Sequence, residues 1–160
     1  MVNGPAAVAG RSMGLLVIAC SLVAGACTPE GEGTPPTVTV SDAFALDPLG
    51  TDRLGLYATL VNHASTPDTL AAVASPVARD ASLHEMTREE GLMRMRPLDA
   101  IELPPGSPVH LAPGSLHGML ETLVRRPVAG DSIEVTFELA KASDVTLTVP
   151  VRHPADARGP

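Results

Sequence analysis

The sequence predicts an all-β domain folded as an antiparallel sandwich or barrel. Short apolar runs recur along the 160-residue chain, and many of the turns between them contain one or more of its 16 prolines and 14 glycines. Such spacing is typical of sandwiches and barrels. No segment keeps the apolar period of an amphipathic helix through four turns. Residues 133–139, IEVTFEL, instead alternate apolar and polar residues, as a half-buried strand does.

Ten strands are expected, and two turns predict how some of them pair. Residues 145–149 repeat the alternation of residues 133–139, and we expect the two runs to pair after a turn near Ser143. A turn over residues 88–91 would join the runs on either side of it into a second hairpin. The expected strands cover residues 38–46, 54–62, 69–74, 81–86, 92–96, 101–103, 109–111, 117–124, 132–139 and 145–151.

The amino terminus has the features of an export signal. A single Arg11 precedes the uncharged stretch 12–26, which has the length of a secretory apolar region and is short for a membrane span. Small residues then lead into Cys27, and this arrangement resembles the lipobox of bacterial lipoproteins. We therefore expect Cys27 to be lipidated and the protein to be exported. Cys20 ends a competing lipobox, and simple secretion or an uncleaved anchor are the alternatives.

The chain divides into four parts. Residues 1–26 are the expected lipoprotein signal peptide. Residues 27–36 comprise the lipidated cysteine and a tether of Thr, Pro, Glu and Gly, a composition that cannot bury apolar area. One domain follows at 37–152, and residues 153–160 are expected to form a short disordered tail whose only histidine is His153.

Composition excludes several classes of function. Eleven Lys plus Arg against eighteen Asp plus Glu give a net charge of −7, which opposes the basic patch needed to bind nucleic acid. Tyr57, Phe44 and Phe137 are the only aromatic residues, so stacking platforms are missing and the core is expected to be aliphatic. Both cysteines, Cys20 and Cys27, lie in the export region, which leaves the domain without a thiolate site, a disulfide or a catalytic thiol.

Two motifs with catalytic associations do not predict an enzyme. Residues 10–14 match G-x-S-x-G, but they lie in the export signal and follow no strand. His84 and Glu85 begin like H-E-x-x-H, yet Arg88 stands where the second histidine is required and the segment is an expected strand. The protein is therefore expected not to be an enzyme.

Methionine is concentrated in one part of the domain. Filler methionine would be spread through the core strands, but none occurs in residues 37–85 or 120–160. Side chains two residues apart point to the same face of a strand. The cluster consists of three such pairs, His84 with Met86, Met93 with Met95 and His117 with Met119. The remaining histidines have no such partner and are expected to be structural or solvated; they are His63, His110 and His153.

Thioether sulfur and imidazole nitrogen together favour Cu(I), which is a soft cation, over Mg²⁺, Ca²⁺ or Mn²⁺, which prefer oxygen. A blue-copper electron-transfer site is a poorer interpretation, because it requires a cysteine beside two histidines and the domain has none. The cluster therefore predicts a copper-binding protein.

The spacing of the cluster resembles a known family. His84, Met95, His117 and Met119 follow the pattern H-x10-M-x21-H-x-M, the copper-binding signature of the extracytoplasmic PCuAC chaperones. Flanking blocks such as LYATLVN at 56–62 and MRMRP at 93–97 are similar too. The resemblance implies a cupredoxin-like fold that binds one Cu(I) per chain through these four residues. Met86 and Met93 are secondary candidate ligands by strand geometry.

The resemblance also implies a role. Family members deliver copper to a copper enzyme, with the binuclear site of cytochrome c oxidase subunit II as the implied recipient and a Sco-type thioredoxin-like protein as a frequent partner. Together with the lipid anchor, this implies a periplasmic or cell-surface metallochaperone. Residues 113–116, PGSL, depart from the Pro-Gly-Gly-aromatic run of the family, and residues 152–160 do not support a second copper site. The alternatives are a metal-free structural or adhesive lipoprotein and a copper-sequestering tolerance protein.

Overall fold

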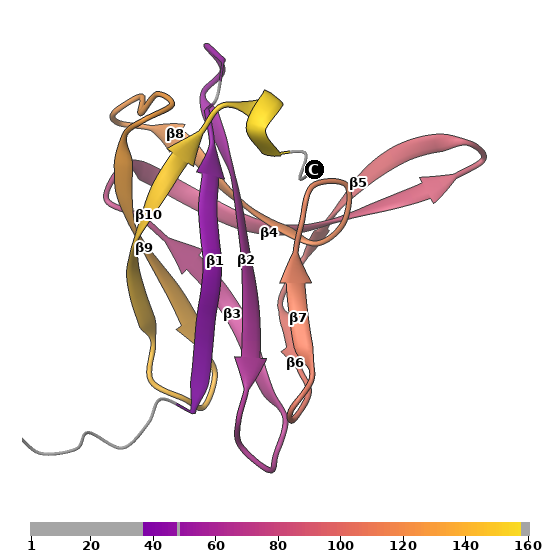
Figure 1. Ribbon diagram of the computed structural model, residues 1–160. Helices are drawn as coiled ribbons and strands as arrows, with labels where there is room; N and C mark the ends of the chain where they lie inside the picture. Colours follow the sequence, from indigo (N-terminus) through magenta and orange to yellow (C-terminus); the bar gives the residue numbers. More distant parts are fainter. Residues whose placement is uncertain (1–36, 48, 158–160) are drawn as a thin grey trace, which may run out of the picture. The chain divides into compact units, whose positions relative to one another are not determined.

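The structure is a computed structural model that describes residues 37–47 and 49–157. Strands account for nearly all the regular secondary structure in these residues (Figure 1). The predicted signal peptide, Cys27 and the tether lie outside these ranges. The elements in chain order are β1 (Val38–Leu46), β2 (Arg53–Asn62), β3 (Asp68–Ala74), β4 (Ala78–Glu89), β5 (Leu92–Leu98), β6 (Ile101–Leu103), β7 (Pro108–Leu111), β8 (His117–Leu123), β9 (Ser132–Leu139), β10 (Val145–Arg152) and the 3-10 helix η1 (Pro154–Ala157).

The predicted all-β fold is confirmed, and each expected run forms a strand. The largest difference in bounds is at β4, which was expected over 81–86 and extends over Ala78–Glu89. Its additional residues pair with β8 at one end and with β5 at the other, so tertiary pairing lengthens the strand beyond its apolar run. Both predicted hairpins, β4–β5 and β9–β10, are present.

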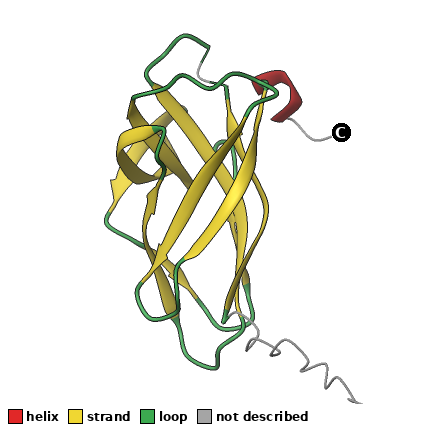
Figure 2. Cartoon of the chain, turned by 90° about the vertical axis from the view of Figure 1, so that its left-hand side faces the viewer, coloured by secondary structure: helices red, strands yellow, loops and turns green. Residues whose placement is uncertain are grey.

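The strands form one continuous sheet that folds into two layers (Figure 2). The first layer has the order β5-β4-β8-β2-β1, with β7 pairing along β2 beyond the end of β8. The second has the order β10-β9-β3-β6. The layers are joined by β1 and β10, which pair in parallel at Ala45 and Val151. This parallel pair, formed by the first and last strands of the domain, is an exception to the predicted antiparallel arrangement.

The aliphatic core lies between the layers. Along β2 the residues alternate strictly, so that Leu54, Leu56, Ala58 and Leu60 are buried while the residues between them face away. Phe137 of β9 is the one fully buried aromatic side chain among the described residues. A Cβ at Gly118 of β8 would lie 3.2 Å from Cγ2 of Val73 of β3, which shows how closely the layers approach. The outer face of β2, β8 and β4 is thus left free for other chemistry.

The predicted tail contains one short element. Residues 154–157 form the helix η1, in which the backbone N–H of Asp156 donates to the carbonyl of His153 at 2.9 Å. The N–H of Ala155 also donates to Nδ1 of His153 at 3.2 Å, so a local hydrogen-bonded turn forms without an apolar run to predict it. Residues 158–160 lie outside the described part of the chain.

Among the described residues, the structure contains no helix with the length and apolar character needed to span a membrane.

Candidate metal centre

Strand pairing brings the candidate donors together on the outer face of β4, β5 and β8. His84 of β4 lies directly opposite His117 of β8, and Met86 lies opposite Met95 of β5. Met119 is two residues from His117 on the same face of β8. Directly paired residues have Cβ atoms about 4.5–5.5 Å apart. The register therefore gathers thioethers and imidazoles from three adjacent strands.

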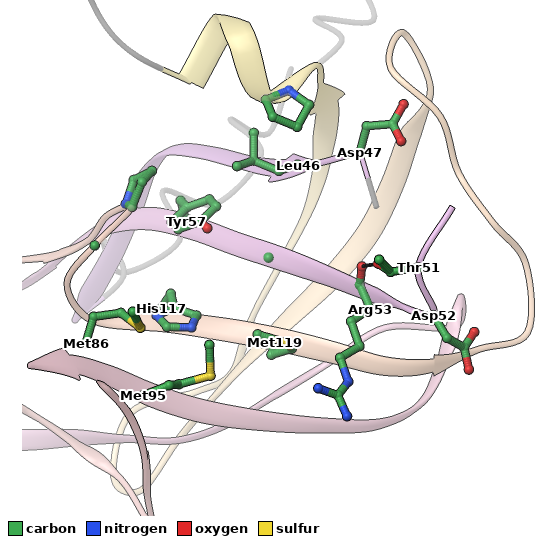
Figure 3. Close-up of a pocket in the computed structure, with 14 residues that line it drawn as sticks. Leu46, Asp47, Thr51, Asp52, Arg53, Tyr57, Met86, Met95, His117 and Met119 are labelled. Carbon is green, nitrogen blue, oxygen red and sulfur yellow. Dashed lines mark hydrogen bonds between the residues drawn. The ribbon is translucent and has the colours of Figure 1, made fainter. Parts of the chain in front are cut away.

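Met86, Met95, His117 and Met119 border a cavity of about 640 Å³ on the outer face. His84 does not line this cavity, but its ring stacks on that of His117, with the centroids 5.5 Å apart. Figure 3 shows Met86, Met95, His117 and Met119 grouped along one side of the cavity. Its other walls come from β2, from the end of β1 and the segment between these strands, from the loop before β8 and from η1. The residues that complete the lining are Leu46, Asp47, Thr51, Asp52, Arg53, Gly55, Tyr57, Pro113, Gly114 and Pro154.

His117 is held in one orientation by the loop that precedes it. Its side chain is buried, and Nδ1 lies 3.0 Å from the carbonyl oxygen of Ser115. A carbonyl can only accept, so Nδ1 carries the proton and Nε2 is left with its lone pair. The same carbonyl accepts the backbone N–H of Met86 at 3.1 Å. The PGSL sequence thus builds a loop that is tied to both β8 and β4.

His84 is held from the opposite side. Its Nε2 lies 2.7 Å from Oγ of Ser82, which donates to Glu121 at 3.2 Å, and Glu121 also pairs with Nε of Arg53 at 3.2 Å. Nδ1 of His84 is buried and has no hydrogen-bond partner. Burial lowers the pKa of His84, the neighbouring His117 lowers it further, and Glu121 opposes both. These effects favour the neutral ring, which is the form that binds a metal ion.

A row of rings runs from the surface into the site. The centroids of Phe44 and Tyr57 are 5.1 Å apart, those of Tyr57 and His117 are 6.3 Å apart, and those of His117 and His84 are 5.5 Å apart. At the outer end, the guanidinium of Arg152 lies 4.5 Å from the centre of the Phe44 ring. Tyr57 thus lies beside the buried ring of His117.

Tyr57 has room in this row because β2 carries a glycine beside it. A Cβ at Gly55 would lie 2.7 Å from the hydroxyl oxygen of Tyr57, so any other residue there would displace the ring. Burial raises the pKa of Tyr57, which keeps the phenol neutral. Tyr57 and Gly55 were not among the residues predicted for the site. Their i, i+2 spacing was visible, but only the strand register places them beside His117 and Met119.

The two secondary candidates differ in position. Met86 lines the cavity with Met95, whereas Met93 lies opposite Arg88, is 51% exposed and does not line the cavity. The hairpin turn sets this register, because Glu90 and Gly91 have φ values of 51° and 83°, a combination that fits a tight two-residue turn. Of the two, only Met86 therefore lies among the cavity donors.

The donor set is soft and uncharged. In the described part of the chain there is no group of three or more His, Cys, Asp or Glu side chains placed to hold a metal ion. Histidines expected to be structural are engaged elsewhere: Nε2 of His63 contacts Thr39 at 2.9 Å and Nδ1 of His110 contacts Thr59 at 3.1 Å. The cavity therefore offers three thioethers and the imidazole of His117, and the imidazole of His84 stacks on that of His117. Each imidazole has one nitrogen uncommitted.

Comparison with known proteins agrees with this geometry. The family described as "Putative lipoprotein LpqE-like" matches residues 38–151. The chain belongs to this LpqE-like family. A relative from Leifsonia xyli subsp. xyli (strain CTCB07), "Putative lipoprotein Lxx21020", is 31% identical over 146 residues, which cover 91% of this chain and 86% of the relative. The family match spans the chain from the start of β1 to Val151 of β10.

Solved structures with the same fold include copper-bound proteins. The copper-bound PCuAC domain from PmoF2 is 32% identical, with a TM-score of 0.64, over 74% of this chain and 94% of that domain. The solution structure of CuI-DR1885 from Deinococcus radiodurans has a TM-score of 0.59 over 79% of this chain and 85% of that one. At 22% identity, the second likeness concerns the fold alone. The predicted resemblance to the PCuAC family and its cupredoxin-like fold are confirmed.

Proposed function

We propose that this LpqE-like protein is an exported, lipid-anchored chaperone that binds one Cu(I) per chain through His84, Met95, His117 and Met119. One observation carries the proposal. Three strands bring three thioethers and the His117 imidazole to one cavity, with the His84 ring stacked on His117, and each imidazole keeps one nitrogen free of hydrogen bonds to the protein. The copper bound by the PCuAC domain from PmoF2, in the same fold, supports the choice of metal.

The chemistry of the donors favours Cu(I) over other ions. Thioethers are soft ligands that need no deprotonation, and they select Cu(I) over the harder divalent ions. In an oxidising compartment, methionines also cannot be lost to a disulfide. Met86 faces Met95 across the hairpin, so it is placed to replace either methionine when the ion enters or leaves.

Release to an acceptor follows from the same features. Met95 is 48% exposed, so a partner protein can reach the ion from the β4–β5 side. The site has no thiolate, and an acceptor with cysteine ligands would therefore bind the soft ion more tightly. We propose the binuclear site of cytochrome c oxidase subunit II as the recipient, reached directly or with a Sco-type thioredoxin-like partner.

A Cu(I) titration against a competing chelator, under anaerobic conditions, tests the binding step. The wild type should take up one equivalent, and the Met95→Leu, Met119→Leu double variant should bind far more weakly with its fold intact, because Leu retains the volume but removes the sulfur. Met93→Leu is the matched control and should leave the affinity unchanged. Equal affinity in the double variant would contradict the ligand assignment.

A copper-transfer experiment distinguishes delivery of copper from its sequestration and from a metal-free structural role. The Cu(I)-loaded protein is mixed with the apo copper domain of cytochrome c oxidase subunit II or with an apo Sco-type domain, and the copper in each is measured after separation. Movement of copper to the acceptor supports delivery. Retention with tight binding would favour a tolerance protein, and failure to bind any Cu(I) would favour the structural alternative.

Lipidation at Cys27 is tested by substitution. Cys27→Ser should release the protein from the membrane fraction and leave Cu(I) binding unchanged, because the anchor and the domain are separate in sequence. Cys20→Ser is the matched control and should do neither. Release by the Cys20 variant alone would move the anchor to the competing lipobox.

A further inference from the structure

The rings of His84 and His117 are held by different nitrogens, Nε2 in His84 and Nδ1 in His117. We infer that they bind Cu(I) through opposite nitrogens, His84 through Nδ1 and His117 through Nε2, and that Ser82 positions His84 for this. The inference rests on the proposed function, because it takes Cu(I) as the ion bound in the cavity. The inference names the ligand atom of each ring. It also gives a role to the residues that hold the rings in place.

The assignment for His117 follows from the hydrogen bond of its ring. The carbonyl oxygen of Ser115 lies 3.0 Å from Nδ1 and has no proton to give, so Nδ1 must donate. A neutral imidazole has one N–H, and Nε2 therefore carries the lone pair. A histidine that donates one ring N–H to a backbone carbonyl and ligates through the other nitrogen is a common arrangement at metal sites.

The assignment for His84 follows from the single proton of a hydroxyl. Ser82 contacts Nε2 of His84 at 2.7 Å and Glu121 at 3.2 Å. The carboxylate of Glu121, paired with Arg53, can only accept, so the Ser82 proton is directed to it. Oγ of Ser82 then accepts the N–H of Nε2, and the lone pair lies on Nδ1.

The opposite tautomer of His84 would be costly. Its proton would lie on Nδ1, which is buried and has no acceptor. A buried donor without a partner has given up its hydrogen bond to water and gained none in return. The unpartnered atom is a second observation, separate from the serine, that fits a lone pair on Nδ1, because a metal ion can satisfy a buried lone pair but not a buried N–H. It also gives that atom an evident use, because a metal ion is the partner it lacks.

Arg53, Glu121 and Ser82 form a chain that ends on His84. They come from β2, β8 and β4, which are neighbours in the sheet, and Arg53 lies directly opposite Glu121. None of the three is itself a proposed ligand. They act as positioning residues that fix the tautomer and the ring plane of His84, whose ring lies 5.5 Å from that of His117 at 19°.

The first experiment needs no copper. Long-range ¹H–¹⁵N spectra of ¹⁵N-histidine-labelled apo protein, recorded at about pH 8 where imidazoles are neutral, report which ring nitrogen carries the proton. We expect His84 to be protonated at Nε2 and His117 at Nδ1. The same tautomer for both rings, or a mixture for His84, would overturn the inference whether or not the protein binds copper.

The second experiment adds Cu(I), which is diamagnetic, to the same sample. Coordination should shift Nδ1 of His84 and Nε2 of His117, with little change at the other two nitrogens. A shift at Nε2 of His84 would overturn the inference and leave the proposed function standing. Methionine methyl shifts with no change at either histidine would instead contradict the proposed ligand set.

Variants test the positioning role. Ser82→Ala should mix the tautomers of His84 and lower Cu(I) affinity roughly 10- to 100-fold, the usual effect of removing a group that orients a ligand. Ser82→Thr keeps the hydroxyl and should restore both properties. Thr59→Val is the matched control, since it removes a hydroxyl contact to His110 away from the cavity and should change neither. An unchanged tautomer and affinity in Ser82→Ala would overturn the role of Ser82.

Discussion

The hairpins β9–β10 and β4–β5 belong to one domain but are stabilised in different ways. In β9, Ile133, Val135 and Phe137 are buried at every second position, and β10 contributes Val149 and Val151. In β5, every residue before Leu98 is exposed. Figure 1 shows the β4–β5 hairpin extending beyond the packed layers. The comparison shows that one hairpin builds the core, while the other is free to carry donors.

The turns of the two hairpins are also stabilised by different interactions. At the end of β9–β10, the carboxylate of Asp68 accepts the N–H groups of Thr69, Lys141 and Ala142 at 2.7, 3.0 and 2.8 Å. The β4–β5 turn has positive φ at Glu90 and Gly91 instead, and the strands next to it carry exposed ion pairs of Glu89 with Arg94 and Arg96. Burial and charge-assisted hydrogen bonds hold the first hairpin, whereas backbone geometry and register hold the second.

Removing the buried ring of β9 should have the largest effect on stability. Phe137→Ala leaves a cavity in the core and should lower the free energy of unfolding by about 3–5 kcal/mol. Leu92→Ala, at a position that is 64% exposed on β5, should change it by less than about 0.5 kcal/mol. Urea denaturation followed by circular dichroism measures both. Similar losses would mean that the two hairpins depend equally on burial.

Asp68→Asn should have the next largest effect, about 1.5–3 kcal/mol, because charge-assisted hydrogen bonds are lost from a buried site. Burial by itself would raise the pKa of Asp68, but three backbone N–H groups, assisted by Lys141, hold the pKa below its ordinary value. The stabilisation is therefore present at neutral pH and lost as the pH falls below about 4. Unfolding curves from pH 3 to 7 should show a gap between wild type and variant that closes in acid. A constant gap would contradict the role of the charge.

A smaller effect is expected at the β4–β5 turn. Gly91→Ala places a side chain at φ +83°, where open space surrounds the Cβ, so only backbone strain of about 1–2 kcal/mol results. Because the turn sets the register of Met86 with Met95, Cu(I) affinity should fall as well. Gly106→Ala is the matched control, with φ +68° and open space but outside the hairpin. The stability of Gly106→Ala should fall by a similar amount, while competition with a chelator should show unchanged Cu(I) affinity. An equal loss of Cu(I) affinity in both variants would contradict the role of the turn.

The smallest effect is expected from the exposed ion pairs of β5. Glu89→Gln removes the partner of Arg94 and Arg96 and should lower stability by no more than about 1 kcal/mol, since exposed pairs are screened by solvent. The difference should shrink further in high salt. A loss as large as that of Phe137→Ala, measured by the same denaturation, would show that charge rather than backbone geometry holds this hairpin.

Much of the fold could be predicted because strands and turns leave local signals. The alternation of β9 and β10 and the turn at 88–91 were sufficient for both hairpins. The parallel pairing of β1 with β10 could not be predicted in this way, since it joins opposite ends of the domain. The helix η1 was missed because its hydrogen bonds are local and need no apolar pattern.

The candidate donor residues could be predicted from the sequence, but the residues that hold them in position could not. The i, i+2 pairs identified the methionines and histidines, since alternation in a strand is a local property. The chain from Arg53 through Glu121 and Ser82 to His84 depends on the register of three strands, which the sequence does not display. The difference between Met86 and Met93 also became visible only through their cross-strand partners, Met95 and Arg88.

X-ray absorption at the copper K-edge of the anaerobic Cu(I)-loaded protein tests the central claim most directly. The account predicts a Cu(I) edge with both sulfur and nitrogen neighbours. The sulfur contribution should be reduced in the Met95→Leu, Met119→Leu variant and absent when Met86→Leu is added. A spectrum with only nitrogen and oxygen neighbours, or a sulfur contribution that survives all three replacements, would show that copper is not bound by the methionines of this cavity.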